Sequence, residues 1–223
     1  MKKIKFIACA GLAALLSFSA HAQLGGFSVP GVGGGGSFGS TAKEYSANVT
    51  TSMLNTVRGV EFAQRASGKK AEADKLDAIA KEIEGMKQPK ADVLEKSMKA
   101  IDANPVDRNA ITAVKSAEGK AMLATATKHM MVAGVYNQRA LASARSLAGM
   151  KPGPMDAASA PGLIEAVKVT AQQGPAIVEN SGKYLSVLTS YLSSNGIAKP
   201  SNADCVALAK KTDPDAASKG ASF

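Results

Sequence analysis

Residues 121–136, AMLATATKHMMVAGVY, are apolar on nearly every side of the helix that they predict. An all-round apolar surface is typical of a helix that is surrounded by other helices. Upstream, Asn104 suits the N-cap of a helix and Pro105 suits its first position, and no further proline occurs before Pro152. The sequence therefore predicts a central helix of up to about 45 residues that begins at Asn104 and is roughly 65 Å long.

Apolar residues at three- and four-residue spacing predict further helices before this segment. The first of them begins at a capping box formed by Thr41 and Glu44 and ends at Gly68. Polar residues, Asn48 and Asn55 among them, are interleaved with its apolar stripe. A second, highly charged helix follows as far as residue 104, with a break or kink at the proline at position 89.

Two more helices are predicted after the central segment. One begins near Pro161, has a kink at Gly174-Pro175, and ends at Asn195-Gly196. A short one in the tail has a capping box formed by Ser201 and Asp204. The fold class is therefore all-α, an antiparallel bundle of about four long helices with a short C-terminal helix and a Gly-rich N-terminal arm.

The first 22 residues have the three zones of a cleavable signal peptide. Lysines at positions 2, 3 and 5 precede an uncharged run, and Ala20-His21-Ala22 places small residues where a signal peptidase cuts. The apolar run, about 15 residues, is shorter than the roughly 20 that a permanent membrane-spanning helix needs. We therefore expect cleavage after Ala22, a mature chain beginning at Gln23, and a periplasmic or secreted protein.

The expected organisation has four parts. The signal peptide (1–22) is followed by a Gly-rich arm (23–40), the helical bundle (41–196) and a tail with a short helix (197–223). The glycine content of the arm makes an ordered conformation entropically costly. Its apolar residues also allow a second interpretation, in which the arm lies in a groove on the bundle.

Removal of the signal peptide changes the composition that matters for function. It removes three lysines, so 24 basic residues remain against 18 acidic ones and the net charge is +6. One histidine (His129) and one cysteine (Cys205) also remain, so no internal disulfide can form. The basic residues are mostly balanced by nearby carboxylates, and aromatic residues are not interleaved with them, so we expect no nucleic-acid partner.

His129 is the strongest candidate ligand for a metal, and Met130 and Met131 follow it. Imidazole and thioether groups together suit Cu(I) or a six-coordinate haem iron. Consecutive side chains on a helix point in directions about 100° apart, however, so neighbours cannot easily hold one ion. We therefore interpret His129 as a histidine satisfied at a helix interface and the methionines as core residues, and we expect no cofactor and no tightly bound metal.

No catalytic constellation is visible in the sequence. The carboxylate pairs Asp74/Asp77 and Glu82/Glu84 lie among lysines on the most charged helix, which is typical of a solvated, salt-bridged face. There is no G-x-S-x-G turn and no phosphate-binding loop with its lysine. Cys205 has two interpretations, a buried small residue or a thiol that pairs with another chain.

These observations favour a non-enzymatic exported protein that acts by protein–protein interaction, by self-association or in a structural role. The alternative is a bundle that binds an apolar small molecule or lipid between its two most buried helices, with a pocket lined by His129, Tyr136, Tyr184 and Tyr191. A metal or haem carrier ranks third, and an enzyme ranks last. A deep apolar pocket would favour ligand binding, whereas a large exposed apolar patch would favour a protein partner.

Overall fold

The computed structural model describes residues 37–153, 156, 160–220 and 222–223. These residues form seven helices and no strand, which confirms the all-α prediction. The predicted signal peptide and most of the Gly-rich arm, up to residue 36, lie outside the described residues. No helix in the described ranges combines the length and the hydrophobicity needed to cross a membrane.

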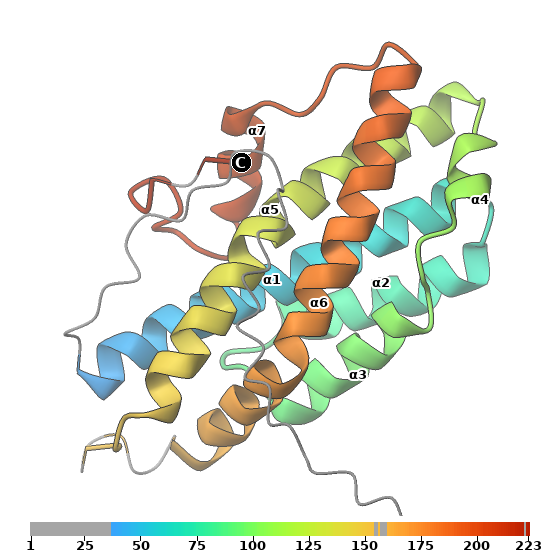
Figure 1. The fold of residues 1–223 in the computed structure, drawn as a ribbon. Helices are drawn as coiled ribbons and strands as arrows, with labels where there is room; N and C mark the ends of the chain where they lie inside the picture. Colours follow the sequence, from blue (N-terminus) through green and yellow to red (C-terminus); the bar gives the residue numbers. More distant parts are fainter. Residues whose placement is uncertain (1–36, 154–155, 157–159, 221) are drawn as a thin grey trace, which may run out of the picture.

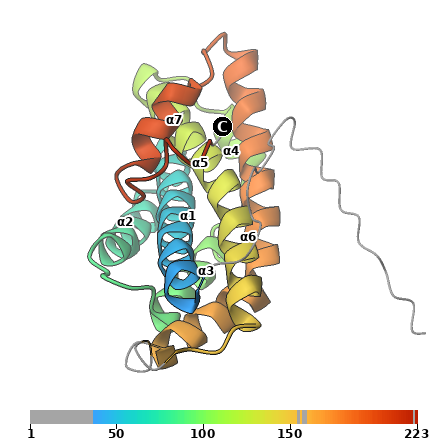
Figure 2. The same ribbon diagram turned by 90° about the vertical axis from the view of Figure 1, so that its left-hand side faces the viewer.

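Three long helices, α1 (Phe38–Ala66), α5 (Ala117–Ala148) and α6 (Ala160–Ser194), lie side by side (Figures 1 and 2). Contacts between α1 and α5 join residues 48 to 143 and 55 to 129, so these two helices run in opposite directions. Contacts between α1 and α6 join residues 45 to 170 and 64 to 184, so these two run in the same direction.

Four shorter helices surround the long ones in the described part of the chain. Helices α2 (Lys70–Glu84) and α3 (Ala91–Asp102) form a hairpin that packs on α1 and, through α3, on α6. Helix α4 (Arg108–Thr112) packs on α6, and α7 (Asn202–Ala209) packs on α5 (Figure 1). Leucine, isoleucine and methionine side chains from α1, α2, α3, α5 and α6 meet in one buried core.

The start of α1 differs from the prediction. The Ser37 hydroxyl accepts a hydrogen bond from the Ser40 amide and caps the helix at Phe38, so the predicted capping box at Thr41 is wrong. Residues 38–40, which were predicted to belong to the arm, are helical. Serine is at least as good an N-cap residue as threonine. The earlier start of the helix also places the Phe38 side chain against the core.

The predicted long helix beginning at Asn104 is also wrong. The Asn104 side chain donates to the carbonyl of Ala100 at the end of α3, and Asp107 caps the five-residue helix α4 instead. The chain then turns, and Ser116 caps α5 by accepting from the amide of Gly119. A Cβ at Gly119 would lie 2.5 Å from Val114 Cγ1, so this glycine lets the turn fold back onto the first turn of α5.

Other helix ends agree with the prediction. Gly68 and Gly196 have φ values of +78° and +66°, the left-handed conformation that ends helices and suits glycine. The Ser201–Asp204 capping box at α7 is present in full. Pro175 lies inside α6, which continues as one helix through it to Ser194.

Candidate functional site

Buried polar side chains form hydrogen bonds in the interior where α1, α5 and α6 meet. The Asn48 side-chain amide donates to Ser143 Oγ at 3.0 Å. The Ser52 hydroxyl donates to Asn137 Oδ1, and the amide of Asn137 donates to Ser181 Oγ at 2.9 Å. Buried hydrogen bonds of this kind fix the register of the helices, because a shift would leave polar groups without partners. Sequence periodicity did not reveal that these residues of α1 face inward.

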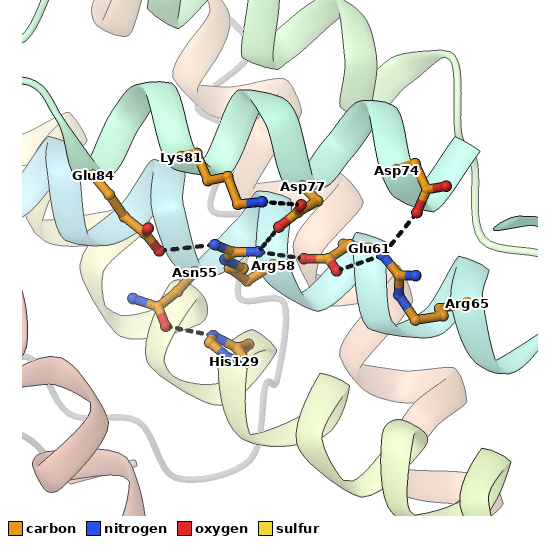
Figure 3. Close-up of polar contacts among 9 residues, drawn as sticks. All are labelled: Asn55, Arg58, Glu61, Arg65, Asp74, Asp77, Lys81, Glu84 and His129. Carbon is orange, nitrogen blue, oxygen red and sulfur yellow. Dashed lines mark hydrogen bonds and ion pairs between the residues drawn. The ribbon is translucent and has the colours of Figure 1, made fainter. Parts of the chain in front are cut away.

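His129 lies on α5 where this helix faces α1. Its Nδ1 is 2.8 Å from Asn55 Oδ1 (Figure 3). The Asn55 amide donates to the carbonyl of Thr51. The Phe62 ring stacks on the imidazole with 5.6 Å between ring centroids. Burial, followed by the positive charges of Arg58, Lys128 and Lys211, lowers the pKa of His129 to about 3. The imidazole is therefore neutral at ordinary pH.

The methionines beside His129 do not share its surroundings. Met130 is fully buried and packs against Gly59 of α1, and Met131 is also buried. In the described ranges, no group of three or more histidine, cysteine, aspartate and glutamate side chains is arranged to hold a metal ion. His129 thus has one asparagine and one aromatic ring as its nearest partners.

An ion-pair cluster joins α1 to α2 next to His129 (Figure 3). The guanidinium of Arg58 lies 2.7 Å from Glu61, 2.6 Å from Asp77 and 3.0 Å from Glu84. Glu61 also pairs with Arg65, which reaches Asp74, and Lys81 pairs with Asp77. The hydrogen bonds from Lys81 and then from Arg58 lower the pKa of Asp77, so this carboxylate is ionised at neutral pH.

A pocket of about 400 Å³ opens between these residues and the tail. Its walls come from α1, α2, α5, α7 and the residues after α7, and they combine apolar with charged side chains: Leu54, Asn55, Arg58, Phe62, Glu84, His129, Leu208, Lys211 and Thr212. Arg58, Glu61 and Arg65 are spaced three and four residues apart, so their side chains lie on one face of a helix. This spacing is the only sequence signal that predicts part of the cluster.

A second, mostly apolar pocket of about 280 Å³ lies where α5 ends and α6 begins. Apolar side chains of α5 and α6, together with Phe38 at the start of α1, form most of its walls: Phe38, Leu147, Ala148, Met150, Leu163, Ile164, Val167, Lys168, Ala171 and Gln172. Ile164, 37% exposed, is the one large apolar side chain exposed on the described surface. No local sequence signal indicates this pocket, because the pocket depends on where two helix ends meet.

The three tyrosines predicted to line a ligand pocket are buried, and none of them lines this apolar pocket. Tyr184 donates its hydroxyl hydrogen bond to the carbonyl of Asn104 at 2.6 Å, and Tyr191 donates to that of Val114 at 2.7 Å. Both therefore tie α6 to the segment between α3 and α5. Of the four predicted lining residues, only His129 lines one of the two pockets described above.

Tyr136 instead holds the C-terminal segment. Its hydroxyl donates to the buried carboxylate of Asp213 at 2.8 Å, and Lys219 pairs with the same carboxylate at 2.6 Å. Arg139 lies over the Tyr136 ring, 5.2 Å from its centroid. Cys205 is fully buried nearby on α7, and burial raises the pKa of its thiol to about 11. The reactive thiolate form is therefore scarce at neutral pH.

Comparison of the chain with models of protein families, with curated proteins and with solved structures finds no match.

Proposed function

We propose that the protein is a non-enzymatic binding protein of the bacterial envelope, a single helical bundle that holds a single-chain anionic amphiphile such as a fatty acid. The observation that supports this function is the apolar pocket between the end of α5 and the start of α6.

Export is part of the proposal. It predicts that the protein recovered from cells begins at Gln23, and N-terminal sequencing that finds Met1 on the soluble product would contradict it.

The size of the pocket favours a slender ligand. Its volume of about 280 Å³ is at the lower limit of the roughly 300–1,000 Å³ typical of small-molecule sites. That space accommodates part of one acyl chain and excludes a two-chain lipid from full burial. An acyl chain gains about 0.8 kcal/mol for each methylene group that it buries, so affinity should rise with each further methylene group that the pocket accommodates.

The polar residues of the pocket favour an anionic head group. Lys168 and Gln172 are its only polar lining residues, and both are exposed. Lys168 takes part in none of the ion pairs among the described residues (37–153, 156, 160–220 and 222–223). Its ammonium group is thus free to pair with a carboxylate while the acyl chain lies against Leu163 and Val167.

The same surface argues for a ligand over an apolar protein partner. A docking patch for a protein commonly exposes several large apolar side chains together. On the described surface only Ile164 does so, and it belongs to the pocket lining. In the part of the chain that the structure describes, the exposed large apolar side chain therefore belongs to a small pocket, which suits a chain-like ligand.

Displacement of a fluorescent acyl probe tests the proposal, and the chain contributes no tryptophan fluorescence of its own. We expect dodecanoate to displace 11-(dansylamino)undecanoic acid from the purified protein. Ala171→Phe, which fills the pocket, should weaken dodecanoate binding at least tenfold. Ala176→Phe adds the same ring at an exposed position of α6 outside the pocket and should leave binding unchanged.

The head group is tested separately. Lys168→Gln should weaken dodecanoate binding about two- to fivefold, the range expected for an exposed ion pair, and should not affect dodecanol. Lys199→Gln, at an exposed position beyond α6, is the matched control. Equal binding by the wild type and Ala171→Phe would refute the proposal. Binding that appears only after deletion of residues 23–36 would also refute the proposal, because the N-terminal arm and not a fatty acid would then be the occupant of the pocket.

A further inference from the structure

His129 offers a hydrogen-bond acceptor that the proposed fatty-acid site does not use. Asn55 donates its amide to Thr51, so its oxygen faces His129 and accepts the proton on Nδ1. In a neutral imidazole the other nitrogen, Nε2, then carries a lone pair. Among the described residues Nε2 has no hydrogen-bond partner, and it is not one of the two buried side-chain atoms that lack a partner there. It is therefore open to a ligand.

The residues around His129 keep Nε2 a hydrogen-bond acceptor. The stacked Phe62 ring and the bond to Asn55 fix the orientation of the imidazole. Its lowered pKa, about 3, means that acid does not convert the acceptor to a donor at ordinary pH. A group with an O–H or N–H is the natural partner for such a nitrogen.

The charges around the pocket favour an anion. Its lining contains one arginine, one lysine and one glutamate, so with His129 neutral the lining carries one net positive charge. Arg58 already forms ion pairs with three carboxylates, Glu84 among them. Lys211 is exposed and forms no ion pair in the described ranges. Lys128, which also acts on His129 electrostatically, adds to the positive potential.

Apolar surface completes the pocket. Leu54, Phe62 and Leu208 also line the pocket, and its volume of about 400 Å³ is within the range of small-molecule sites. We propose that this pocket is a second binding site, specific for a small hydroxy acid. The hydroxyl donates to His129 Nε2, the carboxylate pairs with Lys211, and the apolar body lies against Phe62 and the two leucines.

Nitrogen NMR of the histidine side chain tests this site directly. The His129 signals are assigned by their loss in His129→Gln. The probes are 3-hydroxybenzoate, 4-hydroxybenzoate and 3-(4-hydroxyphenyl)propanoate, which separate the two polar groups by different distances. Each is paired with the analogue that lacks the hydroxyl. We expect at least one hydroxy acid to shift Nε2 saturably and to bind about fivefold more tightly than its analogue, the effect of one net hydrogen bond.

Two variants test the role assigned to the lysine. Lys211→Gln should weaken the binding of the effective hydroxy acid about fivefold and leave the binding of phenol unchanged. Lys210→Gln, its exposed neighbour, should behave as the wild type. Ala171→Phe should also leave this binding unchanged, so failure of the fatty-acid proposal and failure of this one are distinguishable. No shift of Nε2 with any probe, or equal affinities for hydroxy acids and their analogues, would overturn the proposal.

Discussion

Replacing Gly59 by alanine tests how closely α1 and α5 pack. A Cβ at this position would lie 2.8 Å from both Cγ and Cε of Met130 and 3.1 Å from its sulfur. Carbon atoms in contact are normally 3.5–4.0 Å apart, so Met130 or the helix must move. Overpacking of this kind costs about 1–3 kcal/mol, whereas exchanging glycine for alanine inside a helix gains about 1 kcal/mol.

Gly134→Ala is the matched control, because it lies inside α5 and a Cβ there would meet nothing within 4 Å. The helix-propensity gain is common to both variants. The difference between their free energies of unfolding therefore isolates the collision, and we expect Gly59→Ala to be about 1–3 kcal/mol less stable than Gly134→Ala.

Urea denaturation at 25 °C, with the slope of the transition unchanged, measures this difference. In a Met130→Ala background the obstacle is gone, so Gly59→Ala should become stabilising by up to about 1 kcal/mol. Equal stabilisation by Gly59→Ala and Gly134→Ala in the wild-type background would refute the close packing of α1 against α5.

Three further predictions follow from the buried residues. The pKa of His129 is lowered in the fold from 6.5 to about 3, so the unfolded chain binds a proton first as pH falls below 6.5. Stability should decrease by about 2 kcal/mol between pH 7 and pH 5 through this residue, and His129→Gln should remove that part of the slope in urea titrations. Leu188→Ala should cost about 2–5 kcal/mol because Leu188 is fully buried, while Lys75→Ala at an exposed position should stay within about 0.5 kcal/mol; similar small effects at both would contradict the core assignment. Elemental analysis of protein purified without chelators should find no stoichiometric metal, and copper, iron or zinc that is lost in His129→Ala would overturn this expectation.

The parts of the fold that depend on local signals were predictable from the sequence. Ends marked by a left-handed glycine, such as Gly68 and Gly196, and the Ser201–Asp204 capping box lie where expected. The Asn104-Pro105 signal failed because a helix start also depends on what the following turn packs against. Here Tyr184 and Tyr191 bind carbonyls in that connecting segment, and their positions in space are not encoded locally.

The candidate sites were less predictable. His129 was singled out because it is the sole histidine of the expected mature chain, and it was interpreted as a histidine satisfied at a helix interface. Its Nδ1 contacts Asn55 of α1. The inward direction of Asn48 and Asn55 was not visible, because a polar residue at helical spacing reads as solvent-facing. Neither pocket was predictable in its lining, since each joins residues from the start of the described chain to residues more than a hundred positions later.

Native mass spectrometry of the protein with dodecanoate shows whether the pocket between α5 and α6 binds a fatty acid. We expect one dodecanoate per chain in the wild type and in Ala176→Phe, and its loss in Ala171→Phe under the same conditions. An adduct that persists in Ala171→Phe, or no adduct in the wild type at millimolar dodecanoate, would contradict the claim that the pocket between α5 and α6 binds an acyl chain.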